Sequence, residues 1–201
     1  LEEIRALEPV GIILSGGPDS VYEDDAPFPD ATVFNLGVPV LGICYGLQLM
    51  VHQFGGSVQP SSHREYGHAE LEIHAESELF HDIPKKTNVW MSHGDTVQEL
   101  PDGFLSIART DNAPEAGFEH RQRNLYGIQF HPEVAHTEHG KRILENFVKN
   151  ICGCPGDWTS ENFVAETVDR IRSQVGDAEA ICALSGGVDS AVAAALMYKA
   201  I

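Results

Sequence analysis

The first part of the chain alternates between apolar runs and amphipathic patterns. Residues 1–8 have the pattern of a helix end, and the apolar runs at 10–14 and 38–43 each predict a short buried strand. A stretch rich in glycine and aspartate at 15–20 predicts a loop, and the helical spacing over 45–54 predicts a helix. The expected order is therefore strand, loop, strand and helix.

The pattern that follows predicts further strands and one more helix. Alternation of apolar and polar positions favours strands in four places, 69–75, 88–91, 104–108 and 125–130. A helix is expected over about residues 140–151. Strands separated by helices indicate an open α/β sheet with flanking helices, whose site lies at the carboxyl edge of the strands.

A second pattern begins further along the chain. After a first domain over residues 1–151, a linker containing glycine and proline at 152–160 leads into residues 161–201. These predict a helix, a strand at 180–184, a glycine loop at 185–190 and another helix. A strand, a loop and a helix in this order indicate the start of a second α/β domain.

Composition and charge exclude some classes of function. The 201 residues carry a net charge of −17, which argues against binding to nucleic acid or an anionic membrane, because these partners require basic surfaces. The four cysteines fit neither a disulfide framework nor a paired zinc motif, so we expect a reducing, cytoplasmic setting. Leu1 and Ile201 both fall inside helical patterns, so we expect the chain to be a fragment of a longer protein.

Cys44 lies in the stretch GICYG, between the apolar run at 38–43 and the helix at 45–54. A cysteine flanked by glycines at a strand-to-helix turn has the pattern of a nucleophile elbow, in which glycines permit a tight turn. The helix N-terminus is expected to lower the pKa of the thiol, and the N–H of Tyr45 is expected to face an oxyanion. The alternative is a core cysteine in a glycine-rich turn.

A base for such a nucleophile is available at His131, in the stretch HPEV after the last predicted strand. Glu133 lies two residues further on, so in an extended segment its carboxylate can orient the imidazole, while Pro132 fixes the backbone between them. The alternative is a solvated loop histidine. The presence of Cys44 favours the catalytic interpretation, because a thiol nucleophile needs a base and an orienting group.

Two further loops are expected at the same edge of the sheet. In SGGPDS, at 15–20, paired glycines expose backbone N–H groups, and Gly17 is the candidate for a second oxyanion donor. In WMSHGD, after the strand at 88–91, polar groups are expected to line a substrate pocket with Gln48, one helical turn beyond Cys44. The polar side chains are those of Ser92, His93 and Asp95, and Gly94 is expected to contribute to the same glutamine-binding set. Ordinary surface loops are the alternative for both.

The loop SGGVDS at 185–190 suits a phosphate group. It lacks the lysine of a Walker A loop, but it places glycines and hydroxyls before a helix N-terminus, where backbone N–H groups bind phosphate. Asp189 is a candidate for holding Mg²⁺ or for orienting the loop, and both roles stay open. The spacing of histidines with Glu138 matches no standard metal site.

Taken in order, GICYGLQ, WMSHGD and QFHPEV resemble the class I, or triad, glutamine amidotransferases, and LSGGVDSA resembles the pyrophosphate loop of the N-type ATP pyrophosphatases. The resemblance spans nearly the whole chain. It implies a catalytic triad of Cys44, His131 and Glu133, with Gly17 and Tyr45 as the oxyanion hole. It also implies an ATP-binding loop, made of Ser185, Gly186, Gly187, Val188, Asp189, Ser190 and Ala191. Family members often have serine at the last of these positions.

The fold that the resemblance implies is an amidotransferase sheet without its first strand, followed by the start of an adenine nucleotide α-hydrolase-like domain. The implied activity is that of a glutamine-dependent ligase of purine biosynthesis. Glutamine hydrolysis, which needs no cofactor, supplies ammonia that converts xanthosine monophosphate to GMP with ATP and Mg²⁺ in the second domain. The longer protein is expected to be a homodimer.

Two other classes of function compete with this interpretation. One is a cysteine hydrolase or γ-glutamyl peptidase on a related fold, which has no use for the phosphate loop. The other is a non-catalytic binding module, which leaves the HPE stretch unexplained.

Overall fold

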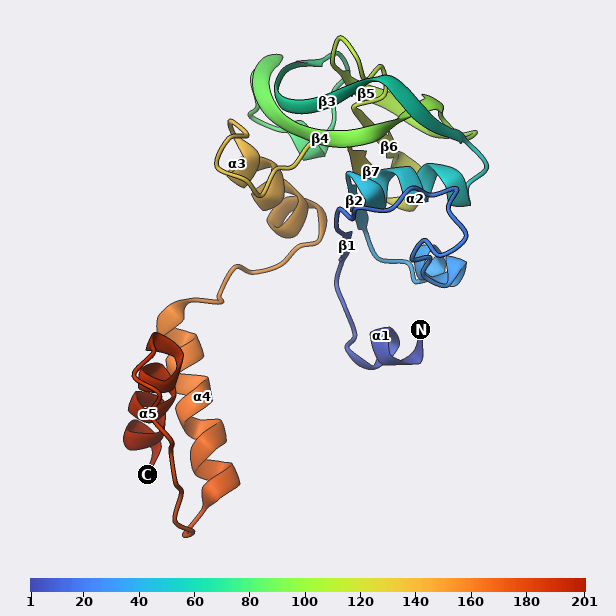
Figure 1. Cartoon of the computed structure of the whole chain (residues 1–201). Coiled ribbons are helices and arrows are strands. Elements are labelled where there is room, and N and C mark those ends of the chain that lie inside the picture. Colours follow the sequence, from blue (N-terminus) through green and yellow to red (C-terminus); the bar gives the residue numbers. More distant parts are fainter. The chain divides into compact units, whose positions relative to one another are not determined.

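The computed structural model describes residues 1–61 and 65–201 of the chain. These residues form two compact units, Leu1–Cys154 and Pro155–Ile201, and each is described by itself (Figure 1). No helix in the described part of the chain has both the length and the apolar character needed to cross a membrane.

Among the described residues of the first unit, seven strands form one sheet in the order β1-β2-β7-β6-β5-β3-β4. Their bounds are β1 Ile12–Leu14, β2 Val40–Ile43, β3 Ser57–Ile73, β4 Lys86–Glu99, β5 Leu105–Arg109, β6 Gly117–His120 and β7 Leu125–Ile128. The neighbours β1, β2 and β7 run parallel, whereas the other neighbouring pairs run antiparallel. The parallel strands therefore end at one common edge.

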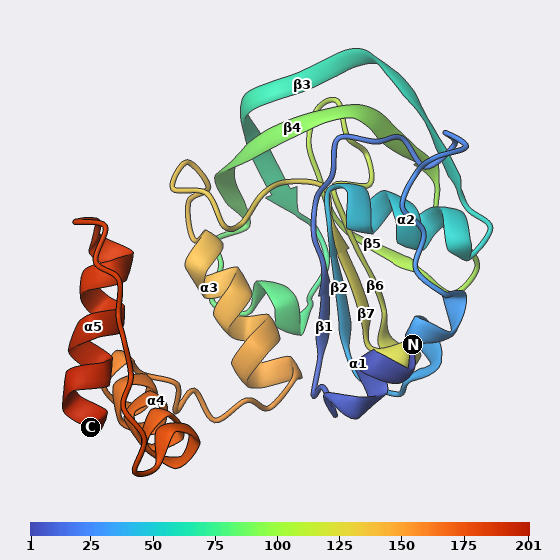
Figure 2. The ribbon, with the colours of Figure 1, turned by 60° about the horizontal axis from the view of Figure 1, so that its bottom comes forward.

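Helices cover both faces of this sheet. The helical segments of the unit are α1 Glu2–Ala6, α2 Tyr45–Gln53 and α3 Gly140–Glu145, the π-helical turn Asn146–Ile151 that continues α3, and the 3₁₀ segments Ala31–Asn35, Glu78–Phe80 and Arg121–Arg123. In Figure 2, α2 lies on one side of β1, β2 and β7, and α3 lies on the other. Two hydrophobic clusters correspond to these two faces.

The sequence of β2 is apolar throughout because the strand is covered on both faces. Val40 packs in the cluster with α2, whereas Leu41 and Ile43 pack in the cluster with α3. Because successive residues of a strand point to opposite faces, a strand covered on both faces needs apolar residues at every position. The expected strand at 38–43 and the expected helix at 45–54 are confirmed.

The first strand differs from the expectation. Residues 10–14 were expected to form a buried strand, but β1 contains only Ile12–Leu14, and Val10 and Ile13 are 58% and 44% exposed. The physical reason is position, because β1 is an edge strand, and β2 is its one partner among the described strands.

The strands β3 and β4 are longer than the sequence pattern indicates. They form one antiparallel pair from Glu72 and Lys86 to Ser57 and Glu99, and Figure 2 shows them curving together beyond α2 and α3. The stretch MSHGD at 91–95 therefore lies inside β4 rather than in a loop after a strand, which corrects that expectation. The short strand β6 was not anticipated.

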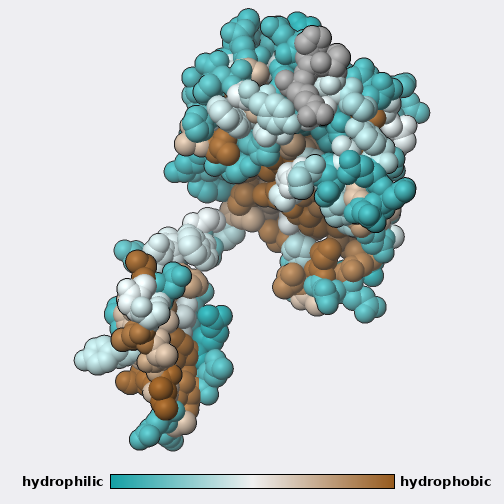
Figure 3. Space-filling view, in the orientation of Figure 1, coloured by the Kyte–Doolittle hydropathy of each residue, from teal (hydrophilic) through white to brown (hydrophobic). Residues whose placement is uncertain are grey.

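The second unit consists of two helices, α4 Ser160–Val175 and α5 Val188–Ala200. The expected strand at 180–184 is wrong, because these residues adopt no regular structure. A strand needs a neighbour for its backbone hydrogen bonds, and residues 155–201, all of them described, offer none. Ile181 is 98% exposed, and Figure 3 shows apolar residues at the surface of this unit.

Candidate active site

Cys44 occupies the turn between β2 and α2, with φ at 52° and ψ at −106°. A positive φ is rare for a residue with a Cβ atom and marks a strained position. Its N–H donates to the carbonyl of Ile128 at 2.8 Å, which continues the pairing of β2 with β7. Cys44 therefore has the backbone of a nucleophile elbow.

The flanking glycines serve close packing rather than the turn itself. The positive φ belongs to Cys44, and neither Gly42 nor Gly46 has one. A Cβ atom on Gly42 would lie 2.5 Å from the carbonyl of Gly46, and one on Gly46 would lie 2.1 Å from the carbonyl oxygen of Leu14. The glycines allow β2, α2 and β1 to approach closely, which corrects the expectation that they supply the tight turn.

Cys44 is 5% exposed, and its Sγ atom has three polar neighbours, one of which is the backbone N–H of Tyr45. Its Sγ atom lies 3.6 Å from the carbonyl oxygen of Ser92 and 3.7 Å from Nε2 of Gln129. Burial raises the pKa of the thiol to about 11, although hydrogen bonds from the N–H of Tyr45 and from Gln129 act in the opposite direction. The expectation of a lowered pKa is therefore wrong for the free protein, and the resting group is a neutral thiol at pH 7.

His131 lies after β7, and both its backbone N–H and its backbone carbonyl are hydrogen-bonded. Its N–H donates to the carbonyl of Trp90 at 3.0 Å, and its carbonyl accepts from the hydroxyl of Thr137 at 2.5 Å. Nδ1 of the ring lies 2.7 Å from Oε1 of Glu133, as the sequence predicts. Because a carboxylate only accepts, Nδ1 carries the proton of the neutral ring, and Nε2 is the nitrogen free to act as a base.

The three segments that the sequence singles out meet at the common edge of β1, β2 and β7. A Cβ atom on Gly16 would lie 3.1 Å from Cε1 of His131 and 3.5 Å from Cβ of Cys44. Gly17 lies over the ring of Tyr45, because a Cβ atom there would be 3.6 Å from Cγ of that ring. The loop at 15–20, the elbow and the histidine are thus neighbours, as the sequence predicts.

Comparisons with known proteins agree with this geometry. The family model described as "Glutamine amidotransferase class-I" matches residues 1–151. The chain belongs to the class-I glutamine amidotransferase family. Similar curated proteins are the GMP synthases (glutamine-hydrolyzing) of Bacillus cereus strain AH820 and Bacillus anthracis, each 52% identical over 200 residues. These matches cover 100% of this chain and 39% of each relative, so the chain spans well under half their length.

Solved structures share the α/β fold of this amidotransferase. A crystal structure of a candidate GMP synthase subunit from Thermoplasma acidophilum matches with a TM-score of 0.62 and 30% identity, over 78% of this chain and 76% of that one. A glutamine amidotransferase from Thermotoga maritima matches with a TM-score of 0.58 and 25% identity, over 72% and 63%. The sheet of the first unit is therefore a class I amidotransferase sheet.

Several of the predicted glutamine-binding side chains in this amidotransferase already have partners. The two ring nitrogens of His93 lie 2.8 Å from the carbonyl of Asp95 and 3.2 Å from the carboxylate of Glu65. The carboxylate of Asp95 accepts hydroxyl hydrogen bonds from Ser20 and Tyr22, at 2.5 and 2.6 Å. Asp95 thereby ties the loop at 15–20 to β4. These two hydroxyls and Glu65 were not anticipated, because their partners are distant in sequence.

Gln48 and the other two predicted groups differ in exposure. Gln48 is 3% exposed, and its amide nitrogen donates to the carbonyl of Asp95 at 3.1 Å. Ser92 is exposed, and Gly94 is half-buried within β4. A role in binding glutamine stays a prediction for these residues.

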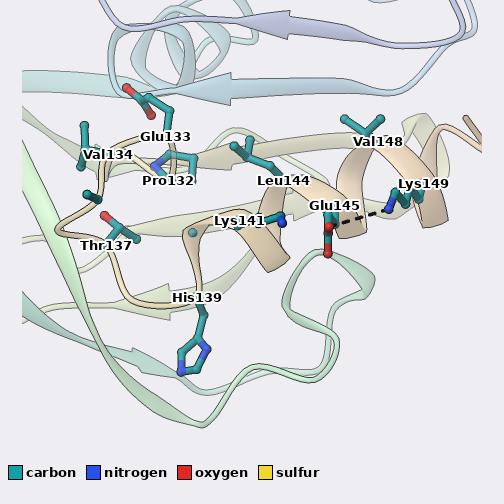
Figure 4. Close-up of a pocket in the computed structure, with 12 residues that line it drawn as sticks. Pro132, Glu133, Val134, Thr137, His139, Lys141, Leu144, Glu145, Val148 and Lys149 are labelled. Atoms are coloured by element: carbon teal, nitrogen blue, oxygen red, sulfur yellow. Dashed lines mark ion pairs between the residues drawn. The ribbon is translucent and has the colours of Figure 1, made fainter. Parts of the chain in front are cut away.

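A groove of about 660 Å³ lies beside Glu133, between the loop after His131 and the helix α3 (Figure 4). Its apolar wall includes Leu144 and Val148, and an ion pair joins Glu145 to Lys149 at 3.7 Å. Neither Cys44 nor His131 lines the groove, so it is separate from the thiol.

In the second unit, the residues predicted to bind ATP form one compact turn at the N-terminus of α5. The hydroxyl of Ser190 donates to the carbonyl of Gly187 at 2.9 Å and lies 3.1 Å from the hydroxyl of Ser185. Gly186 has a φ of 83°, which favours glycine. Val188, Asp189 and Ala191 lie in the first turn of the helix, and no group of three metal-ligating side chains is present among the described residues.

Proposed function

We propose that the first unit is the glutaminase part of a glutamine-hydrolysing GMP synthase. The observation that carries this proposal is the placement of the Cys44 elbow beside the hydrogen-bonded pair of His131 and Glu133, with Gly16 between Cys44 and His131. A strained cysteine, a base and a carboxylate in this arrangement are the components of a thiol nucleophile with its general base. The names of the relatives support glutamine as the substrate.

The first half of the reaction releases ammonia. As Sγ of Cys44 bonds to the γ-carboxamide carbon of glutamine, the thiol proton passes to Nε2 of His131. The N–H groups of Gly17 and Tyr45 stabilise the oxyanion that forms on the carboxamide oxygen. The carbon–nitrogen bond then breaks, and His131 returns the proton to the departing nitrogen. The products are ammonia and a γ-glutamyl thioester on Cys44.

The second half regenerates the thiol. Water attacks the thioester carbon while His131 takes a proton from it, and the bond from carbon to Sγ breaks. The sulfur recovers a proton from the imidazolium, and glutamate leaves. Glu133 keeps the ring in the orientation that leaves Nε2 available in both halves. Because the pKa of Cys44 is raised to about 11, proton removal by His131 is essential at neutral pH.

The second unit is proposed to begin an ATP site. Its turn fits a phosphate group, because the first N–H groups of α5 have no acceptor within the helix and the hydroxyls of Ser185 and Ser190 lie beside them. In the longer protein, bound ATP with Mg²⁺ would activate xanthosine monophosphate for attack by the ammonia. The residues proposed to hold it are Ser185, Gly186, Gly187, Val188, Asp189, Ser190 and Ala191.

The substitution Cys44→Ala tests the proposal in two assays. In the chain itself, release of glutamate and ammonia from glutamine should fall by about 1000-fold, because the nucleophile is lost. In the full-length protein, formation of AMP from ATP and xanthosine monophosphate should stop with glutamine but continue with ammonium salts. Cys154→Ala is the matched control and should leave both rates unchanged. Equal loss with glutamine and with ammonium would contradict the division of labour between the two units.

A further inference from the structure

Gln129 is a buried polar residue directly behind the nucleophile. It lies between the end of β7 and His131 and is 1% exposed. Its backbone N–H donates to the carbonyl of Ala116 at 2.9 Å. Its side chain reaches Cys44, with Nε2 at 3.7 Å from Sγ. A buried side-chain amide needs hydrogen-bond partners.

The orientation of this amide follows from a chain of hydrogen bonds. The backbone carbonyl of Asp95 can only accept, so the group of Gln48 that faces it at 3.1 Å is the amide nitrogen. The same nitrogen lies 3.4 Å from Gln129, whose near atom must then be the oxygen. The NH₂ group of Gln129 is consequently the group that faces the sulfur.

A donor in this position distinguishes the two forms of the sulfur. A neutral thiol is a weak acceptor, whereas a thiolate is an anion that attracts N–H donors strongly. The second contact of Sγ, the carbonyl of Ser92 at 3.6 Å, accepts from a thiol but offers nothing to a thiolate. Among the described residues, the backbone N–H of Tyr45 and the side chain of Gln129 are therefore both placed to favour the charged form.

We propose that Gln129 is a catalytic residue that stabilises the thiolate of Cys44 by donating Nε2–H to Sγ, and that Gln48 is a positioning residue that orients the Gln129 amide. The proposal rests on the proposed glutaminase function. It adds a donor on the sulfur to those on the substrate oxyanion, so that the sulfur is stabilised while its proton moves to His131. The hydrogen bond from Gln129 also lowers the pKa of Cys44 against the effect of burial.

The replacement Gln129→Met removes the donor and keeps a side chain of similar length. The test measures the rate at which the neutral reagent iodoacetamide alkylates Cys44 at pH 8.5, relative to Cys154 in the same sample. A rise of about 1 unit in the pKa of Cys44 lowers its thiolate fraction about tenfold, and higher intrinsic nucleophilicity recovers about threefold. We expect Cys44 to react about threefold more slowly. Glutamine turnover should lose about tenfold in kcat with KM within about twofold.

Two further variants keep the result interpretable. Asn146→Leu removes an equally buried amide, which donates to the carbonyls of Leu79 and His81 and lies outside the site, and it should leave the relative rate unchanged. Gln48→Met should slow Cys44 in the same direction but by less, and it carries the test if the Gln129 variant does not fold.

The outcomes separate this proposal from the proposed function. If Cys44 reacts as fast or faster in Gln129→Met, the role is packing alone and the proposal is overturned. If the parent chain hydrolyses no glutamine, the proposed function fails, while the alkylation ratio still decides whether Gln129 acts on the sulfur.

Discussion

Two loops of this chain have almost the same sequence and different surroundings. SGGPDS at 15–20 and SGGVDS at 185–190 differ only at Pro18 and Val188. The first is hydrogen-bonded to, and packed against, residues that are distant in sequence, whereas the second makes its hydrogen bonds within itself. This difference indicates that the role of such a glycine loop depends on the elements packed around it.

The serines that end the two loops show the contrast in detail. The hydroxyl of Ser20 donates to the carboxylate of Asp95, which is 75 positions away, at 2.5 Å. The hydroxyl of Ser190 donates to the carbonyl of Gly187, three positions away, at 2.9 Å. The first bond ties the candidate oxyanion loop to β4, whereas the second closes the turn before α5.

The largest difference is expected when one glycine of each loop is replaced by alanine. In Gly16→Ala, the new Cβ lies 3.1 Å from Cε1 of His131, so the imidazole must move relative to Cys44. We expect kcat for glutamine hydrolysis to fall by about 10- to 100-fold, since small displacements of reacting groups are costly. In Gly187→Ala, the Cβ has ordinary contact with Ser185 at 3.5 Å, so the same assay should show no change. Equal activity of both variants would mean that the first loop is not packed against the catalytic groups.

Replacing the two serines should lower the free energy of unfolding of the two units by different amounts. Ser20→Ala leaves a partly buried oxygen of Asp95 without its donor and should lower the free energy of unfolding of the first unit by about 1–2 kcal/mol. Ser190→Ala lies in an exposed turn and should cost about 0.5 kcal/mol or less. Trp90 and Trp158 are the two tryptophans, one in each unit, so urea unfolding of single-tryptophan variants reports each unit separately. A larger loss of unfolding free energy in Ser190→Ala than in Ser20→Ala would contradict this prediction.

Much of the first unit could be predicted from its apolar pattern, and the extent of β4 is the clearest exception. The pattern identified β2 and α2 because both faces of β2 are covered by apolar residues. The pattern did not predict that β4 continues through His93 and Asp95, because these two residues are polar although they are buried within the strand. Their partners, Glu65 and Ser20, lie far away in the sequence, so burial of these positions could not be inferred locally.

The candidate site divides in the same way. Cys44, His131 and Glu133 could be brought together from sequence, because each follows the end of a predicted strand. The raised pKa of the thiol could not, because it depends on how deeply the tertiary structure buries the sulfur. Gln129 had a local signal, since it is a polar residue in an apolar strand immediately before the HPE stretch, but its contact with the sulfur requires the pairing of β2 with β7.

The smallest effect should come from making the two loops identical. Val188 is the first residue of α5 and is 78% exposed, and proline is well tolerated at the first helical position, where its fixed φ suits the helix. We expect Val188→Pro to keep α5 and to change the free energy of unfolding of the second unit by about 0.5 kcal/mol or less. Circular dichroism and urea unfolding monitored at Trp158 measure both quantities. If α5 were instead lost, the residue that differs between the loops, and not their surroundings, would determine which one starts a helix.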